Sequence, residues 1–422
     1  MNDLYGIFKK NSSDNHYVSF AKSLNSAYTS KYTRESMKSI ENYCSHGANI
    51  LINNGVCYVS YIRNTAENND DELSSTLELL LVTFSLERAL CDDFDPNTEI
   101  KRIIIGRMGN ELLGERAITG FKGNSMIFVN DKLYFCFSFG CEDGRFKTFR
   151  IVYDIEADRL TDPVLMKLNY HGKLCDLDDE LINRIYEDNG YARAEEAIVE
   201  PVSMWSEYKG EYYTSMLLGC PTPNNGIVIK TRDFETVELV SVIPENENGS
   251  AEAISFIHEG RMYIACRQNW TTPYMLLMTY DVDAQIWKEP YKIEDANSRP
   301  FIFSHMNELY LYNTVDEGYR CFSNISVIRT SKQAHNRKNN PIDTVATLYG
   351  CGSYNGFAVY GDRIFFVGSK DARVHFGELK LKRFSPIDIE DKLIAMFNEG
   401  IESGYTANPS DSDIAIGAQR NS

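Results

Sequence analysis

The chain has 422 residues, of which 43% are hydrophobic, and its formal net charge is −17 at pH 7. This hydrophobic content is enough for a folded core and excludes a wholly disordered chain. The excess of 60 acidic over 43 basic residues disfavours generic nucleic-acid binding, which depends on Lys and Arg contacts to phosphates.

The first part of the chain, residues 1–40, is polar and predicts an N-terminal arm. Its opening stretch, MNDLYGIFKKNSSDNHY, has no apolar core of the kind that secretory signals contain. No stretch of the sequence approaches the roughly eighteen consecutive apolar residues of a membrane span. We therefore expect cytoplasmic synthesis without a signal peptide and no membrane insertion.

A hairpin-like unit recurs through residues 41–384. Each copy has an apolar strand, a tight turn with Gly, Asn or Asp, and a second strand that opens with an aromatic residue. The copies are Ile50–Tyr61, Met126–Phe139, Met204–Leu217 (the weakest), Ser255–Arg267, Phe301–Asn313 and Gly356–Gly368. Further strand-like sequence follows most copies, so each repeat predicts a four-stranded sheet. The series predicts an all-β, six-bladed β-propeller, with a β-sandwich as the alternative.

Two segments outside the repeat have helical patterns. DLDDELINRIYEDNG, residues 176–190, starts with acidic residues and predicts a helical insertion between the second and third repeats. SPIDIEDKLIAMFNEG, residues 385–400, predicts a C-terminal helix, with Ser385 as N-cap, Pro386 in the first turn and Gly400 at the stop. A polar tail follows, so residues 385–422 form the last predicted unit.

The cysteines and histidines predict neither a metal site nor a cofactor. The ten cysteines contain no C-x-x-C pair, and Cys57, Cys136 and Cys266 lie inside strand-like runs, which favours buried thiols. The seven histidines show no H-x-x-H spacing.

Charged residues mark the two ends of the fourth repeat. Glu252 precedes its first strand and Arg267 ends its second, with Glu259-Gly260 at the turn between them. The simplest interpretation is an ion pair at the rim of the fold, which contributes little to stability. A more specific hypothesis is that both side chains enter one pocket.

Later repeats supply further residues for such a pocket. The next candidate arginine is Arg320 in GYRCFSNISVIRTS, with Arg299 in NSRPFIF as its rival. Tyr354 follows in SYNGFAVYGDRIFF. Asn269 and Trp270, just after Arg267, would present a polar group and a stacking face to a sugar, although Trp270 would serve equally as a core residue.

This order of residues resembles the sialidase (neuraminidase) superfamily of six-bladed propellers. In that family a Glu precedes a strand that ends in an Arg, and a second Arg and a Tyr follow in later blades. The resemblance implies that Tyr354 is a nucleophile activated by Glu252, while Arg267 and Arg320 (or Arg299) bind the carboxylate of a sialic acid. It also implies an acid/base aspartate in a first-blade loop, where RNTAENNDDELSS offers Asp70 and Asp71.

The sequence departs from the family in two places. The family has an arginine in the innermost strand of the first blade, in a pattern like R-I-P, whereas HGANILINNG (residues 46–55) has neither Arg nor Pro. Arg116 and Arg193 are the arginines that would substitute from elsewhere. The family's Asp-box turns are eroded in Thr231–Glu238 and Thr279–Trp287. Because each arginine fork contributes strongly to carboxylate binding, the missing one bears on catalysis.

Three functions remain as hypotheses. The first is a sialidase-like propeller that binds a glycan with little or no hydrolysis, resembling those of phage host-recognition structures. A phage protein leaves the cell by lysis, so it needs no signal peptide, and its partners would be a glycan and other virion proteins. The second is an active exo-sialidase with a tyrosine nucleophile. The third is a structural adaptor propeller in which the Glu and Arg pattern is a relic.

Overall fold

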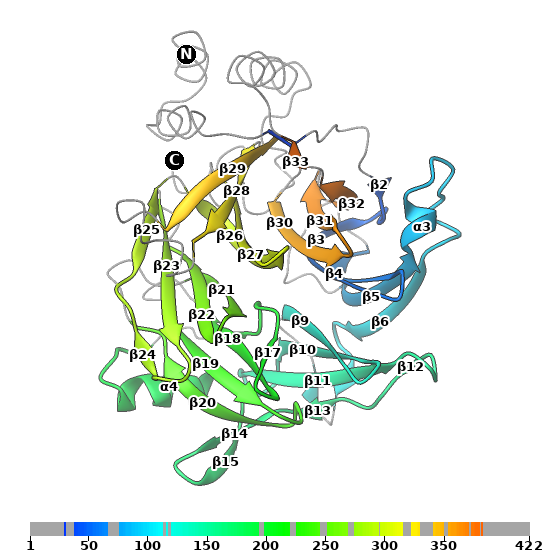
Figure 1. Ribbon diagram of the computed structural model, residues 1–422. Coiled ribbons are helices and arrows are strands. Elements are labelled where there is room, and N and C mark those ends of the chain that lie inside the picture. The colour runs from blue at the N-terminus through cyan, green and yellow to red at the C-terminus, as the bar shows by residue number, and fades with distance from the viewer. Residues whose placement is uncertain are drawn as a thin grey trace, which may run out of the picture.

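The computed structural model describes residues 29–30, 38–65, 76–112, 115–116, 120–193, 198–219, 225–244, 251–268, 274–294, 296–314, 322–329, 341–349, 353–370, 373–379 and 381–382. In these ranges the chain is mostly β, with two short helices, and its sheets surround a common centre in a propeller arrangement (Figure 1). No helix in the described ranges is both long and apolar enough to cross a membrane.

Nearly all described strands belong to six sheets of four or more strands. The first contains β3 (Cys44–Asn53), β4 (Val56–Asn64), β5 (Leu77–Ser85) and β6 (Lys101–Arg107). The second contains β9 (Phe121–Val129), β10 (Lys132–Gly140), β11 (Phe146–Asp154), β12 (Arg159–Leu160) and β13 (Val164–Leu165). The third contains β14 (Lys167–Tyr170), β15 (Lys173–Asp176), β16 (Ile198–Glu200), β17 (Ser206–Tyr208), β18 (Glu211–Gly219), β19 (Asn225–Thr231) and β20 (Thr236–Val242).

The other three sheets use the second half of the chain and two short strands from its beginning. The fourth contains β21 (Ala251–His258), β22 (Arg261–Arg267), β23 (Tyr274–Asp281), β24 (Ile286–Trp287) and β25 (Tyr291–Glu294). The fifth contains β26 (Asn297–His305), β27 (Glu308–Thr314), β28 (Phe322–Ile328), β29 (Ile342–Tyr349), β1 (Thr29–Ser30) and β33 (Leu381–Lys382). The sixth contains β30 (Ser353–Tyr360), β31 (Arg363–Lys370), β32 (Arg373–Leu379) and β2 (Lys38–Ser39). A separate two-stranded sheet pairs β7 (Glu111–Leu112) with β8 (Glu115–Arg116).

The inner strands of neighbouring sheets contact one another around the centre. β3 contacts β9, β9 contacts β16, β18 contacts β21, β21 contacts β26, and β26 contacts β30. β30 also contacts β3, so the ring of sheets is closed. In Figure 1 these strands encircle the middle of the molecule.

The core lies between the sheets, as strand alternation requires. On β22, Met262, Ile264 and Cys266 pack with residues of the third sheet, while the intervening Tyr263 and Ala265 pack with residues of the fifth. Similar apolar clusters lie at the other sheet boundaries, including the one between the sixth and first sheets. The predicted burial of Cys57, Cys136 and Cys266 is confirmed.

The ring closes with strands from the segment predicted to be an arm. β2 pairs antiparallel with β32 of the sixth sheet, and β1 pairs with β29 and β33. Glu41, which follows β2 and is 2% exposed, accepts hydrogen bonds from Tyr61 Oη at 2.6 Å and Arg63 Nη1 at 3.3 Å in the first sheet. This segment therefore joins the last sheet to the first, and the sheets extend into residues assigned by sequence to the arm.

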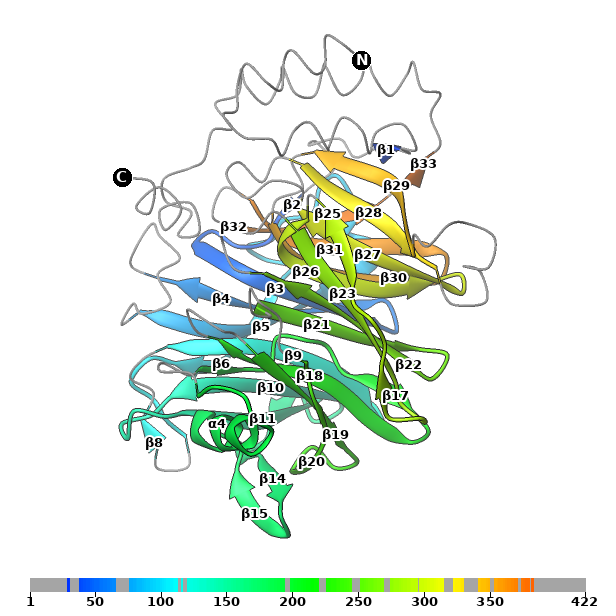
Figure 2. The ribbon, with the colours of Figure 1, turned by 90° about the vertical axis from the view of Figure 1, so that its left-hand side faces the viewer.

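The described helices are α3 (Leu86–Ala89) and α4 (Asp179–Asp188). α4 lies within the predicted insertion at residues 176–190. Asp178 caps it by accepting a hydrogen bond from Leu181 N at 2.8 Å. Its apolar face, Leu181, Ile182, Ile185 and Tyr186, packs in the cluster between the second and third sheets. β14 and β15, just before the helix, project from the lower end of the molecule (Figure 2). The predicted C-terminal helix at residues 385–400 lies outside the described residues.

The eroded Asp-box turn between β19 and β20 keeps its polar contacts. Thr231 Oγ1 accepts from Phe234 N at 3.0 Å and donates to Thr236 O at 2.8 Å. Asp233 Oδ1 accepts from the backbone N–H groups of Glu235 and Thr236 at 2.8 and 2.9 Å. The turn therefore forms without the Gly and Trp of the family motif.

Candidate functional site

Five inner strands have an irregular register near the same end. The shifts lie between His46 and Asn49 in β3, Lys122 and Ser125 in β9, Ala251 and Ile254 in β21, Asn297 and Phe301 in β26, and Ser353 and Gly356 in β30. Within them are Gly47, Gly123, Glu252, Arg299 and Tyr354. Each of these lies six residues before the end of its strand, as Tyr354 does in a strand ending at Tyr360. Because a bulge re-aims a side chain, the closed ring brings these five positions toward one end of the centre.

The backbone is left-handed at four of the five positions. The φ angles are 69° at Gly47, 68° at Gly123, 43° at Glu252 and 54° at Tyr354. Glycine adopts this conformation freely, but for other residues it costs about 1–2 kcal/mol. Such strain is retained where the surroundings impose it, and it concentrates at functional sites. The two non-glycine residues are the predicted base and the predicted nucleophile.

Arg267 connects these two residues. Its Nη1 donates to Glu252 Oε2 at 2.5 Å and to Tyr354 Oη at 3.4 Å. The Arg267 side chain is 3% exposed and that of Glu252 is 17% exposed. The structure therefore brings Glu252, Arg267 and Tyr354 together, and the Glu252–Arg267 pair lies at the centre of the ring and not on its rim.

Arg299 reaches across the ring from the fifth sheet. It is 4% exposed, and its Nη2 donates to Asn49 Oδ1 at 3.0 Å in the first sheet and to Val202 O at 3.1 Å before β17. Burial lowers its pKa, and the charges of Glu252, Tyr354 and Glu200 oppose this effect. Its Nε has no hydrogen-bond partner within the described ranges. Arg299 therefore lies in the site, whereas its rival Arg320 lies outside the described residues.

The first sheet contributes a histidine and a glycine where the resemblance predicts an arginine. The His46 ring lies edge-on to the Tyr354 ring, with centroids 6.2 Å apart. A Cβ added at Gly47 would have no described atom within 4 Å. The strand therefore leaves space beside the site at the place of the missing arginine.

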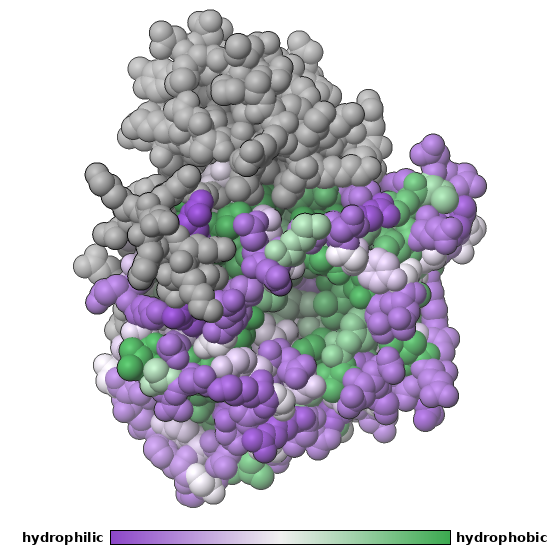
Figure 3. Space-filling model, in the orientation of Figure 1, coloured by the Kyte–Doolittle hydropathy of each residue, from purple (hydrophilic) through white to green (hydrophobic). Residues whose placement is uncertain are grey.

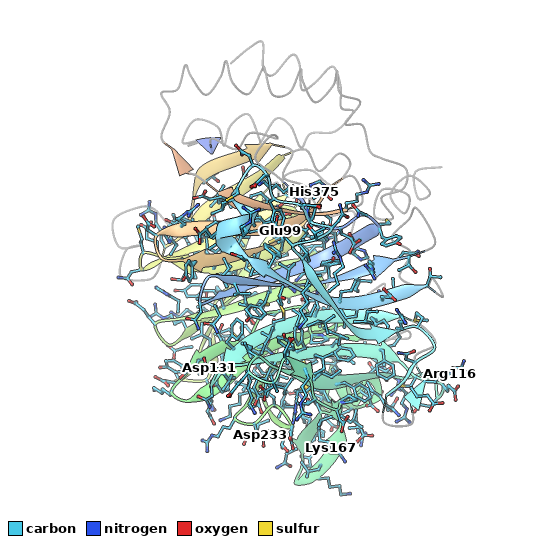
Figure 4. All side chains as sticks on the ribbon, turned by 90° about the vertical axis from the view of Figure 1, so that its right-hand side faces the viewer. Glu99, Arg116, Asp131, Lys167, Asp233 and His375 are labelled. Carbon is cyan, nitrogen blue, oxygen red and sulfur yellow. The ribbon has the colours of Figure 1, made fainter. Side chains whose placement is uncertain are left out.

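The two proposed substitutes for that arginine lie elsewhere. Arg116 is on β8 at the edge of the molecule (Figure 4), where its Nε donates to Gly109 O at 3.3 Å. Arg193 pairs with Glu187 at 3.6 Å and also with Glu180, both on α4. Each is engaged by groups outside the five bulge positions, Arg116 by a backbone oxygen and Arg193 by α4, so neither completes the site.

Two site residues were missed from the sequence, Lys122 on β9 and Glu200 on β16. Lys122 Nζ lies 3.7 Å from Glu200 Oε1, and both side chains are 17% exposed. Burial raises the pKa of Glu200, Lys122 opposes the rise and Glu252 adds to it. One sequence pattern indicates Lys122: it directly precedes the bulge glycine Gly123, as His46 directly precedes Gly47.

The charges at the centre favour an anionic ligand. The described cations are Lys122, Arg267 and Arg299, against the carboxylates Glu200 and Glu252. The cations therefore outnumber the carboxylates here, in a chain whose net charge is −17. Guanidinium and ammonium groups bind carboxylates through charge-assisted hydrogen bonds. On the side of the molecule drawn in Figure 3, hydrophobic residues lie toward the middle and mostly hydrophilic ones around the margin.

Several predicted site residues lie outside the described ranges: Asp70, Asp71, Asn269, Trp270 and Arg320. Within the described ranges, no group of three or more His, Cys, Asp or Glu side chains is placed to hold a metal ion.

Comparison with protein-family models found no match, and comparison with curated proteins found none either. Solved structures do match. Hadza microbial sialidase Hz136 has a TM-score of 0.56 and 8% identity, over 82% of this chain and 68% of that chain. Phage phi92 endosialidase has a TM-score of 0.55 and 8% identity, over 85% of this chain and 70% of that chain.

A third match is Trypanosoma rangeli sialidase in complex with sialic acid, with a TM-score of 0.51 and 9% identity. It covers 88% of this chain but only 59% of that chain, so the present chain spans less than two thirds of its length. Identities this low show the fold alone. The chain is a mostly β propeller with distant structural similarity to sialidases and to a phage endosialidase.

Proposed function

We propose that this chain is a six-bladed, sialidase-like propeller that binds an acidic sugar at the centre of its ring, with little or no hydrolysis. One observation carries the proposal: Arg267 Nη1 lies within hydrogen-bonding distance of both Glu252 and Tyr354. These residues match the order of the family pattern, and Arg299 lies beside them. The excess of cations at the site supports a ligand with a carboxylate.

The expectation of weak hydrolysis rests on the arginine that the first sheet lacks. A sialidase-like reaction needs the sugar held firmly while Tyr354 attacks, and binding energy is the source of that positioning. His46 and Gly47 stand where the family pattern has an arginine fork, and a Cβ added at Gly47 would have no atom of the described residues within 4 Å. A ligand would therefore be held less rigidly here than in a site with the full set of arginines.

We further propose that the chain acts in host recognition as part of a phage particle, with other virion proteins as partners. The structural similarity to a phage endosialidase supports this setting. The glycan would then be a receptor on the host surface.

The proposal is tested by glycan binding. Purified protein is applied to an array of sialylated and neutral glycans, and we expect selective retention of sialylated ones. Arg267→Ala should abolish this retention. Arg363→Ala is the matched control, because Arg363 also pairs with a glutamate, Glu378 at 2.8 Å, in the sixth sheet. Equal binding of sialylated and neutral glycans, or no binding, would favour the structural adaptor.

An active exo-sialidase is the second candidate, favoured by the left-handed backbone at both Glu252 and Tyr354. A fluorogenic sialoside separates the two functions. Steady turnover by the wild type that Tyr354→Phe abolishes would establish the enzyme and overturn the binding-only proposal. We expect no such turnover. Tyr354→Phe should still bind the ligand, because the substitution keeps the aromatic ring of the side chain.

A further inference from the structure

The three cations at the centre differ in how much of each side chain is exposed to solvent. The Arg267 side chain is 3% exposed and Arg299 is 4% exposed, whereas the Lys122 side chain is 17% exposed. Arg267 pairs with Glu252, and Arg299 Nη2 donates to two protein oxygens. Lys122 also has a protein partner in Glu200, but it is the most exposed cation of the three.

Lys122 reaches the site because of the register of β9. It precedes Gly123, which occupies the bulge position shared with Glu252 and Tyr354. Its Nζ forms an ion pair with Glu200 Oε1 at 3.7 Å. Glu200 in turn interacts electrostatically with Glu252 and Arg299. Lys122 and Glu200 therefore belong to the same group of charges as the residues of the family pattern, although they come from the second and third sheets.

We infer that Lys122 recognises the carboxylate of an acidic sugar in this site, in place of the arginine that the first sheet lacks. This inference rests on the proposed function. An ammonium is a compact charge with rotatable donors, so it contacts a carboxylate at one point and not as a planar fork. Lys122 would then select ligands by charge and leave their orientation to other residues.

Glu200 also affects how strongly the site prefers an acidic sugar over a neutral one. Its carboxylate competes with the ligand carboxylate for Lys122 and repels it, as Glu252 also does. Replacing Glu200 with glutamine removes one of these charges while keeping the shape of the side chain. Affinity for an acidic sugar should therefore rise, while affinity for a neutral analogue should not change.

The test compares two probes on the full chain by calorimetry or ligand-observed NMR. They are the methyl α-glycoside of N-acetylneuraminic acid and its carboxylic methyl ester, which differ in the charge of one group. The wild type should bind the acid roughly tenfold more tightly than the ester, as expected for a hydrogen bond to a charged group. Lys122→Met should bring this ratio close to one by weakening the acid alone. A merely structural defect would weaken both probes.

Lys132→Met is the matched control. Lys132 lies at the other end of the same hairpin and forms a similar ion pair, with Asp154 at 3.6 Å. It should keep the wild-type ratio. Lys122→Arg should also keep it, because the charge remains, and Glu200→Gln should raise affinity for the acid about threefold, as expected when a nearby like charge is removed.

The outcomes separate this inference from the proposed function. If the wild type prefers the acid and Lys122→Met keeps that preference, the inference is wrong and the proposed function stands. If the wild type binds neither probe, both fall. Should Lys122→Met fail to fold, Glu200→Gln decides: unchanged or reduced affinity for the acid overturns the inference, and increased affinity for the acid alone supports it.

Discussion

Arg267 and Glu252 form an ion pair across the first two strands of one sheet, and a bulge makes it possible. Ala251 is opposite Arg267 and Ile254 is opposite Ala265. Two residues of β21, Glu252 and Ala253, therefore lie opposite the single residue Cys266 of β22. The left-handed backbone of Glu252 then turns its carboxylate to 2.5 Å from Arg267 Nη1. On a regular hairpin Glu252 would lie opposite Cys266 and on the other face of the sheet from Arg267, so the bulge is what lets the two side chains pair.

Removing Arg267 should destabilise the fold as well as abolish ligand binding. Arg267→Ala leaves Glu252 without its main countercharge, and such a loss costs roughly 3 kcal/mol in a largely buried pair. Arg267→Ala combined with Glu252→Gln should recover most of that loss, because no lone charge remains. Urea unfolding of the two single variants and the double variant measures the coupling. Additive effects of the two substitutions would show that the pair does not couple in the folded state.

The bulge glycines should differ sharply in their tolerance of a methyl group. Gly123 and Gly47 have φ angles of 68° and 69°, so alanine costs about 1–2 kcal/mol at either position. At Gly123 the new Cβ would also lie 2.6 Å from Pro201 O, whereas at Gly47 it would meet no described atom within 4 Å. We expect Gly123→Ala to be less stable than Gly47→Ala by about a further 1–3 kcal/mol. Denaturant unfolding of both checks this, and equal losses would contradict the steric argument.

Asp179 should make stability depend on pH. Burial raises its pKa from 3.8 to about 6, with the neighbouring Asp178 adding to the rise and the Phe146 amide opposing it. The folded state holds the Asp179 proton more tightly than the unfolded state does. The resulting stabilisation of the folded state is fully present below about pH 3.8 and is lost as pH rises through about 6.

Asp179→Asn should therefore be more stable than the wild type by roughly 1–3 kcal/mol at pH 7.5, with no advantage at pH 4. Asp162→Asn, at an exposed position, is the control and should leave stability within about 0.5 kcal/mol of the wild type. Unfolding curves at the two pH values measure the difference. A constant difference between wild type and Asp179→Asn at both values would be evidence against this assignment.

Glu41 should be a main contributor to closure of the ring. Its buried carboxylate accepts from Tyr61 Oη, Arg63 Nη1 and two backbone N–H groups. Glu41→Ala leaves these donors without their acceptor and should cost about 3 kcal/mol. Glu238→Ala, which removes a 63% exposed partner of Lys230, should cost less than about 1 kcal/mol. Thermal and urea unfolding would show a comparable effect of both substitutions if Glu41 had no such role.

Part of this protein follows from local sequence. Alternating apolar residues and turns such as Asn54-Gly55 determine each hairpin, because side-chain period and turn chemistry act over a few residues. The capped, acidic start and apolar spacing of Asp179–Asp188 determine α4 in the same way. Glu252 and Arg267 also belong to this part, since one hairpin holds both and its bulge turns the Glu252 carboxylate toward Arg267.

The rest was decided by closure of the ring. Hairpin periodicity does not reveal which end of a strand faces the centre, so Lys122 and Glu200 look like ordinary strand residues in the sequence. Only the packing of neighbouring sheets brings them within 3.7 Å of each other, with Arg299 close enough to influence Glu200. The same packing pairs β2, from the predicted arm, with β32 of the sixth sheet. The sequence determined the hairpins and one charge pair, and the tertiary structure decided the composition of the site, because contacts between distant segments depend on how the sheets pack.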